Sequence, residues 1–159
     1  RVISYHLGSR ERLVAEEQAE RYVADGRAEA DRLATAVAVS TSPDDFRAAC
    51  LDIVRARVSA ERTASRFKQA SALGAGIERP DLRELLAEQQ HAVTERVATS
   101  VAQAQRRGLF CADLDPFGVA EVISALSFGF VLSDLDGGAR SRDGVVGVLD
   151  RFISSLVAA

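Results

Sequence analysis

The apolar residues of this chain follow a helical spacing. They return at three- and four-residue steps, and the strict alternation of a β-strand does not recur. Helix-start signals, in which a polar residue precedes a proline at the first helical position, stand at Ser42-Pro43, Arg79-Pro80 and Asp115-Pro116. These signals predict an all-α fold with a break around Gly74 and Gly76. The expected helices cover about residues 10–40, 43–73, 80–107, 116–135 and 142–157.

The predicted helices differ in how much of their circumference is apolar. Residues 80–107 carry one apolar stripe and a charged back, which is typical of a helix with one buried face. That stripe consists of Leu82, Leu85, Leu86, Val93, Val97, Val101 and Ala104. Between Phe117 and Leu132 the only charged residue is Glu121, so this helix must be buried on more than one side. The helix over 142–157 also has a wide apolar stripe.

The two C-terminal helices have more apolar surface than one subunit can cover, which predicts a homodimer. The simplest arrangement is a four-helix bundle in which the last two helices of one chain pack against the same two helices of a second copy. The alternative is that residues 116–135 form the central core helix of a monomer. The residues expected at the dimer interface are Phe117, Ile123, Phe130, Val131, Val145, Leu149, Phe152, Ile153 and Leu156.

The N-terminal segment combines a short helical end with the start of a new helix. Tyr5 and His6 precede a predicted break at Gly8, Ser9 is a candidate N-cap, and Arg10 opens the next helix. A phenol, an imidazole and a guanidinium can all meet phosphate oxygens, and such contacts position a protein on DNA. His6 could instead be a satisfied histidine at a helix end, and Arg10 part of a solvated first turn.

This segment resembles the junction after the recognition helix in repressors of the TetR family. The family pattern is an apolar residue, two positions rich in tyrosine, His, Phe, a short turn, Lys, Glu, any residue and Leu. It is matched by Ile3, Tyr5, His6, Glu11 and Leu13. Leu7 replaces the usual Phe, Arg10 the usual Lys, and Ser4 a position often filled by Tyr. The order and length of the later helices also agree with the family's effector domain.

The resemblance implies two domains and a regulatory function. Residues 1–9 would be a remnant of the helix-turn-helix DNA-binding domain, and residues 10–159 a TetR-like helical domain for effector binding and dimerisation. Tyr5, His6 and Arg10 would contact the DNA backbone. The protein would be a ligand-responsive repressor that binds operator DNA as a homodimer and is released by a small-molecule effector. Since a helix-turn-helix needs its first two helices, roughly 40 residues would precede this chain. The alternative is a helical protein–protein interaction module without DNA binding.

The resemblance also implies an effector pocket inside each subunit, between the middle helices and residues 116–135. Candidate lining residues are Phe67, Leu73, Gln89, His91, Phe110 and Phe128, with Gln69 and Gln90 as further polar anchors. Large apolar side chains with a few polar groups are how ligand pockets are usually built. Each phenylalanine could equally be plain core, and His91 a surface histidine.

Net charge, cysteine content and the length of apolar runs limit the class of protein further. The net charge of −3 over 159 residues is mild, whereas a compact DNA-binding domain is usually basic. Cys50 and Cys111 do not make a disulfide framework, which favours a cytoplasmic protein. We expect no signal peptide, and no apolar run that approaches the length needed to cross a membrane.

The sequence contains no pattern of residues that is typical of a catalytic site. His6 and His91 lack metal-ligand spacing, and no phosphate-binding glycine loop or nucleophile motif occurs. Asp113 and Asp115 flank a helix start, where carboxylates favour the helix dipole. We therefore expect no enzyme activity, no cofactor and no metal.

Overall fold

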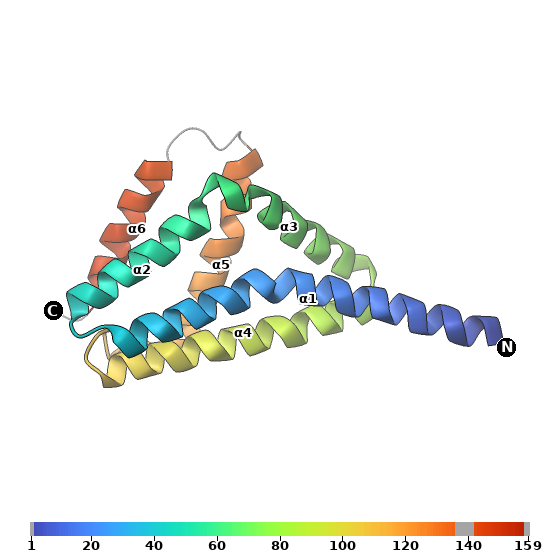
Figure 1. Cartoon of the computed structure of the whole chain (residues 1–159), viewed down its shortest axis with the longest axis horizontal. Helices are drawn as coiled ribbons and strands as arrows, with labels where there is room; N and C mark the ends of the chain where they lie inside the picture. Colours follow the sequence, from blue (N-terminus) through green and yellow to red (C-terminus); the bar gives the residue numbers. More distant parts are fainter. Residues whose placement is uncertain (1, 136–141, 158–159) are drawn as a thin grey trace.

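The computed structural model of the protein describes residues 2–135 and 142–157, with side chains described for residue 10 and from residue 12 on. In these residues six α-helices and one short 3-10 helix follow one another without a β-strand (Figure 1). The elements are α1 (Val2–Val39), α2 (Pro43–Val58), η1 (Ala60–Arg62), α3 (Thr63–Glu78), α4 (Pro80–Arg106), α5 (Pro116–Leu135) and α6 (Arg142–Leu156). The predicted all-α class is confirmed.

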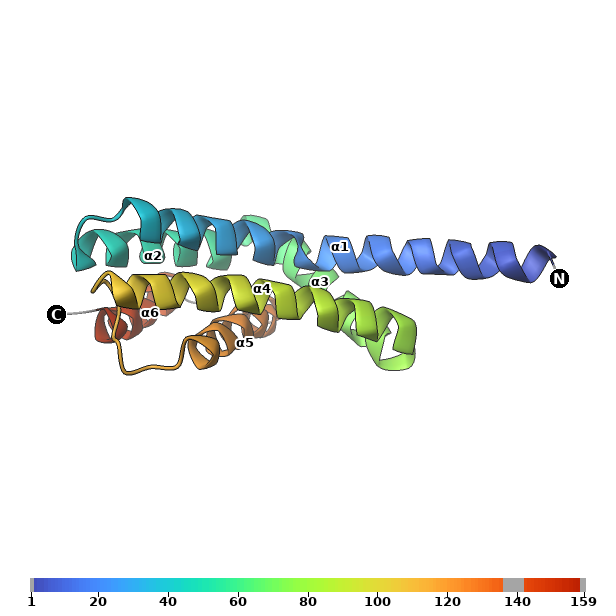
Figure 2. The ribbon, with the colours of Figure 1, turned by 90° about the horizontal axis from the view of Figure 1, so that it is seen from below.

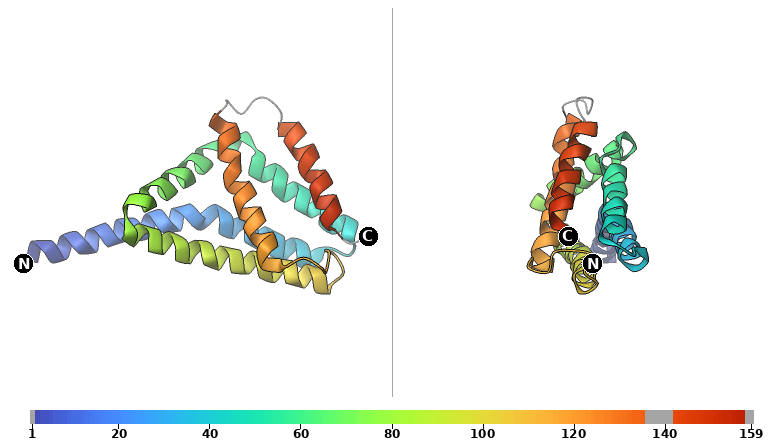
Figure 3. Two further views of the ribbon diagram at one scale, coloured as in Figure 1. Left: turned by 180° about the vertical axis from the view of Figure 1, so that it is seen from behind. Right: turned by 90° about the vertical axis from the view of Figure 1, so that its left-hand side faces the viewer.

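The helices form a triangle with one helix crossing its interior. In Figure 1, α1 and α4 lie side by side along the base, α2 and α3 make the two other sides, and α5 runs between them. The helix α6 lies beside α2. Seen from below and from the end, α5 and α6 share one face of the molecule, and α1 and α2 lie on the other (Figures 2 and 3). The N-terminal part of α1 projects beyond the triangle.

The base of the triangle is the most closely packed part of the fold. Four alanines of α1, at positions 15, 19, 30 and 36, are buried, and their small size lets α4 approach. Gly26 faces Val93 of α4 so closely that a Cβ at that position would lie 3.3 Å from the valine Cγ1. The apolar stripe predicted for residues 80–107 is confirmed, since all of it except the half-buried Leu85 lies in the core.

The expected single helix over 43–73 is wrong, because the chain turns at Ser59. There the backbone has an extended ψ of 152°, and α2, η1 and α3 make an elbow at residues 57–66. Arg66 holds this elbow: it donates to the carbonyl oxygens of Arg57 (2.6 Å) and Ser59 (3.2 Å) and to the carboxylate of Asp134. Sequence periodicity could not show this bend, since it depends on a buried arginine that reaches a residue of α5.

Two predicted glycine breaks are also absent. α1 continues through Gly8 and Ser9, and α3 continues through Gly74 and Gly76 to Glu78. A glycine inside a helix costs roughly 1 kcal/mol relative to alanine, which is not enough to end a helix that neighbouring residues support. At Gly76 the absent side chain has a use, because a Cβ there would lie 3.0 Å from the Cδ1 atom of Leu86 in α4.

The last two helices are held by fewer contacts than the base. α5 packs on α4 and α3, α6 packs on α2, and the backbones of α5 and α6 stay apart (Figure 1). The C-terminal end of α6 is tied to the α4–α5 connection through the backbone, where Cys111 N donates to Leu156 O at 2.8 Å. Of α5 only Ala120 and Val131 are buried. Most of its apolar surface therefore remains uncovered within the described subunit.

The composition of α5 corrects one expectation. An 18-residue stretch of this helix has a mean hydropathy of 1.6, so α5 could cross a membrane by length and composition alone, contrary to the prediction that no such run exists. The same test is passed by core helices of soluble proteins. Here α5 packs on two helices of the subunit, and its Asp134 accepts hydrogen bonds in a buried ion pair.

Candidate ligand-binding cavity

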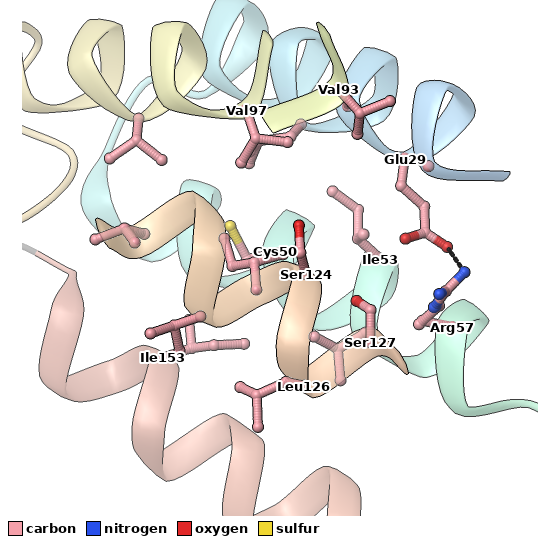
Figure 4. A pocket seen from close by; sticks show the side chains of 18 of the residues that line it. Glu29, Cys50, Ile53, Arg57, Val93, Val97, Ser124, Leu126, Ser127 and Ile153 are labelled. Atoms are coloured by element: carbon pink, nitrogen blue, oxygen red, sulfur yellow. Dashed lines mark hydrogen bonds and ion pairs between the residues drawn. The ribbon is translucent and has the colours of Figure 1, made fainter. Parts of the chain in front are cut away.

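A cavity of about 570 Å³ lies inside the triangle. Its walls come from all six α-helices and from the α4–α5 connection, and its volume is typical of sites for small molecules. Figure 4 looks into it, with Val93 and Val97 of α4 on one side and Leu126 of α5 and Ile153 of α6 on the other. α5 and α6 together form one wall of this cavity.

One end of the cavity is almost wholly apolar. There α2, the α4–α5 connection and the end of α6 meet around Phe46, Phe110 and Val157, which pack in one cluster with Cys50 and Ile53. Burial raises the pKa of the Cys50 thiol to about 12, so this sulfur stays a neutral apolar group at physiological pH. This end offers mainly apolar contact area.

The other end carries a continuous line of polar side chains, which we call the polar seam. It runs from α1 through α2 and α3, back to α1 and on to α4 and α5, and consists in this order of Glu29, Arg57, Gln69, Tyr22, Gln90 and Ser124. Each member is hydrogen-bonded to the next: Tyr22 Oη donates to Gln90 Oε1 at 3.2 Å, and Gln90 Nε2 to Ser124 Oγ at 3.3 Å. Gln69 connects the two halves of the seam, since its Nε2 donates to the backbone oxygen of Tyr22 at 3.2 Å.

Arg57 and Glu29 form the charged part of the seam (Figure 4). Arg57 Nη1 donates to Glu29 Oε1 at 3.0 Å, Nη2 donates to Gln69 Oε1 at 3.3 Å, and Arg57 is only 7% exposed. Burial raises the pKa of the Glu29 carboxyl, and the positive charges of Arg57 and Arg62 oppose that rise. The buried Nε of Arg57 has no hydrogen-bond partner, a condition that costs about 1–3 kcal/mol or more for a charged group.

The seam also touches the elbow. Arg62 pairs with Asp25 of α1, and Ser65 donates to the same carboxylate. The Arg57 carbonyl is one of the groups that Arg66 binds. The polar end of the cavity is thus built into the contact between α1 and the α2–α3 elbow.

The predicted pocket residues divide into two groups. Phe110, Phe128, Gln69 and Gln90 line the cavity, whereas Phe67, Leu73, Gln89 and His91 do not. Phe67 is exposed, and Leu73 packs against a separate core cluster. Gln89 accepts a hydrogen bond from Arg27, and His91 is an exposed partner of Glu95 at 3.3 Å.

Sequence reasoning missed the charged pair, although a signal was present. On α2, Phe46, Cys50, Ile53 and Arg57 recur at helical spacing, so Arg57 stands on an apolar stripe. On α1, Glu29 stands between Gly26 and Leu33 in the same way. A charged residue on the apolar stripe of each of two helices indicates a buried pair.

The residues predicted for the dimer interface all belong to α5 and α6. Phe117, Ile123 and Phe152 are exposed, and Phe130, Val145, Leu149, Ile153 and Leu156 are half-buried. Val131 is buried inside the subunit and is not available to a second chain. Several of these residues also line the cavity, so the two predicted surfaces meet at α5 and α6.

The residues predicted to contact DNA are at the projecting end of α1. Arg10 is exposed. The side chains of Tyr5 and His6 lie outside the described part of the structure.

Comparison with models of protein families finds a match. Residues 47–158 match the BetI-type transcriptional repressor, C-terminal domain, a segment that covers most of α2 and all of α3 to α6. Comparison with curated proteins found no match. Since the matched segment spans more than half of the chain, and the helical architecture agrees with it, this chain belongs to the TetR family of transcriptional regulators.

Proposed function

We propose that this chain is the sensing and dimerising part of a repressor that binds operator DNA as a homodimer and releases it when a small molecule binds. The observation that carries the proposal is the cavity, whose polar end is built partly from α1, the helix that projects toward the N-terminus. A ligand there would contact the element that leads to the DNA-binding head. Family membership indicates a regulator and not an enzyme.

Dimerisation is supported by the exposed apolar face of α5 and α6. Leu132, Leu135 and Val148 are among its most exposed large apolar residues. An apolar surface of this kind is typical of a site that another protein covers. A second copy packed on this face would also cover the wall of the cavity that α5 and α6 form.

Release of DNA would follow from a change in subunit arrangement. A ligand can shift the equilibrium between two arrangements only if it binds one of them more tightly. The cavity is lined by the elements that would differ between them, namely α1 and the face formed by α5 and α6. In one arrangement the two DNA heads would match successive major grooves, and in the other they would not.

A cytoplasmic location follows from this function, because operator DNA lies there. The apolar composition of α5 then serves packing within the dimer. Residues 1–9 would be the end of the helix-turn-helix domain, and residues 10–159 the effector domain.

The proposal is tested by DNA binding of the chain extended by its native upstream segment. Binding to labelled duplex DNA from the region flanking its gene is measured by fluorescence anisotropy at several salt concentrations. We expect affinity to fall steeply with salt, because phosphate contacts release counterions. Arg10→Ala should reduce the slope of log affinity against log salt by about 1, and Arg32→Ala, which changes another exposed arginine of α1, should not. Absence of salt-dependent binding would overturn operator recognition.

A further inference from the structure

We propose that the hydroxyl groups of Ser124 and Ser127 on α5 form the polar anchor of the cavity, and that they bind a carbonyl-type oxygen on an otherwise apolar, uncharged effector. The inference rests on the proposed function, in which the cavity holds the effector. It goes further by naming the two residues that would hold the effector and the chemical group that they would select.

Ser124 and Ser127 lie on the side of α5 that lines the cavity. Residues three apart on a helix are neighbours on its surface, so the two side chains stand close together. In Figure 4 both hydroxyl oxygens point from α5 into the cavity. The other α5 residues along this stretch of the wall are apolar, namely Ile123, Leu126 and Phe128. The two serines therefore form one polar spot on an apolar wall.

Neither serine donates its hydroxyl proton to another atom of the described residues. A serine inside a helix commonly bonds the carbonyl oxygen one turn back. Ser100 and Ser154 do so in this chain, at 3.1 and 2.7 Å. Ser124 Oγ instead accepts a hydrogen bond from Gln90 Nε2 at 3.3 Å, and Ser127 Oγ has no partner in the described part of the chain. Both hydroxyls thus keep a proton that they can donate to a ligand.

The Ser127 hydroxyl is open to a molecule in the cavity. Ser127 is half-buried. Among the buried and half-buried residues that the structure describes, Arg57 Nε is the one side-chain polar atom that is both closed to water and without a partner. The unpaired Ser127 Oγ is therefore reachable, and its residue lines the cavity. A ligand that displaces water from it binds well only if the ligand restores the lost hydrogen bond.

Two donors that converge on one spot fit a carbonyl oxygen. Such an oxygen has two lone pairs and can accept a hydrogen bond from Ser124 and from Ser127 at the same time. A purely apolar molecule would leave both hydroxyls unpaired in a water-poor site, which is unfavourable. The acceptor would also lie at the end of the polar seam, which continues from Ser124 through Gln90 to Tyr22 of α1.

Charged groups fit this spot poorly. The serine hydroxyls carry no charge, and the nearby charges of the seam, Glu29 and Arg57, are already paired with each other. A carboxylate or an ammonium would either be buried without an opposite charge or have to break this ion pair, and both are costly. Asp115, which also lines the cavity, is exposed and caps α5 through Gly118 N at 2.7 Å.

The rest of the lining sets the body of the effector. Val93 and Val97 of α4 lie across the cavity from α5 (Figure 4), and Phe46 and Phe110 belong to the apolar cluster at one end. Burial of apolar surface against these side chains supplies most of the binding free energy, while a few polar groups fix the orientation. The structure thus matches an apolar molecule with one oxygen acceptor.

The experiment measures which polar group the cavity prefers. The full chain is titrated with Nile red, an uncharged dye that fluoresces in apolar sites, and the dye is then displaced by three probes that share one octyl chain. Methyl octyl ketone carries an acetyl group, nonanoate a carboxylate, and octyltrimethylammonium a fixed positive charge. We expect the dissociation constant of the ketone, corrected for the affinity of the dye, to be at least about tenfold lower than that of either charged probe.

Serine variants test the anchor. Ser127→Ala removes a hydroxyl that has no partner in the described part of the chain, and it should weaken ketone binding about fivefold, the effect of one neutral hydrogen bond. The double variant Ser124→Ala/Ser127→Ala should weaken it at least about tenfold. Ser133→Ala is the matched control, because Ser133 lies on α5, is exposed and is outside the cavity lining. It should leave ketone binding unchanged.

A probe without an oxygen separates hydrogen bonding from a general change of the cavity. Butylbenzene has no acceptor of this kind, so Ser127→Ala should bind it as tightly as the unchanged protein does. Thermal unfolding followed by circular dichroism shows whether each variant folds.

The outcomes separate this inference from the proposed function. The inference is overturned, while the ligand-binding cavity stands, if either charged probe binds more tightly than the ketone. The same holds if folded Ser127→Ala binds the ketone as well as the unchanged protein does, or loses ketone and butylbenzene equally. If neither the dye nor any probe binds, both fail. The ranking of the probes by the unchanged protein tests the inference even if the double variant does not fold.

Discussion

The helices α4 and α5 are adjacent in sequence and pack on each other, yet they use apolar residues differently. α4 has a charged back and one apolar stripe, and nine of its 27 residues are buried. α5 is much more apolar over 20 residues, and only Ala120 and Val131 are buried. The apolar content of a helix therefore does not measure how far its own subunit covers it.

The difference has a physical origin in what surrounds each helix. α4 lies between α1, α3 and α5, and its stripe is covered by their side chains. α5 is covered by α3 and α4 on one side only, while α6 packs on α2 and leaves the remaining faces to the cavity and the surface. The apolar surface of α5 is thus available to two kinds of partner, a ligand inside the subunit and a protein outside it.

The largest effect is expected where α5 is anchored by charge. The side chains of Arg66 and Asp134 are each only 3% exposed, and Thr63 and Arg142 also approach the Asp134 carboxylate, at 2.9 and 3.7 Å. Asp134→Ala leaves Arg66 buried without its partner and should lower the free energy of unfolding by about 3–5 kcal/mol in chemical denaturation. Asp52→Ala removes an exposed partner of Arg55 and should cost less than about 1 kcal/mol. Equal losses in the two variants would show that the elbow does not depend on this pair.

The second prediction compares burial on the two helices directly. Leu82 of α4 is fully buried, and Leu132 of α5 is 67% exposed. Leu82→Ala should lower the free energy of unfolding by about 2–5 kcal/mol, because a cavity replaces the side chain. Leu132→Ala should change it by less than about 0.5 kcal/mol when measured at protein concentrations where the chain is monomeric. A similar loss in both would mean that α5 is as well covered within the subunit as α4.

The third prediction asks what covers α5 from outside. Leu132→Asp places a charge on its exposed face away from the cavity lining, and should raise the dimer dissociation constant at least about 30-fold in sedimentation experiments. Ile77→Asp is the control, because Ile77 of α3 is equally apolar, even more exposed, and away from the α5–α6 face. An unchanged protein that stays monomeric at all concentrations would favour a helical module that binds a different partner.

The smallest effect is the pH dependence of the same anchor. Hydrogen bonds from Arg66 hold the pKa of the Asp134 carboxyl below its ordinary 3.8. A lowered folded-state pKa stabilises the fold above that ordinary value, and this stabilisation is lost as the pH falls through the lowered pKa. Below about pH 3.8 the stability of the unchanged protein should therefore decrease more steeply than that of Asp134→Asn. Parallel pH profiles would show that this carboxyl does not titrate differently in the two states.

Much of the architecture could be predicted from local signals. The starts of α2, α4 and α5 follow polar–proline pairs, and Ser42 caps α2 by accepting a hydrogen bond from Asp45 N at 3.1 Å. The elbow could not be predicted in this way, since the bend at Ser59 is held by Arg66, whose partner Asp134 is 68 residues away. The glycine positions misled the prediction because the helices α1 and α3 continue through them.

The candidate site was predicted only in part for the same reason. Gln69, Gln90, Phe110 and Phe128 were found by their residue type and segment, but this approach gave no weight to the buried ion pair. Two opposite charges on apolar stripes can be seen in the sequence. The packing of α1, α2 and α3 decides that Glu29 and Arg57 form an ion pair. It also decides that Arg57 Nε has no hydrogen-bond partner.

The sequence by itself determined that the protein is helical, that its last helices carry surplus apolar surface, and that its N-terminal segment resembles a repressor junction. These are properties of residue type and spacing, which act within a few turns of one helix. The tertiary structure decided where the chain bends and where the cavity lies. It also decided which charges meet at the polar end, because each of these depends on contacts between residues far apart in the chain.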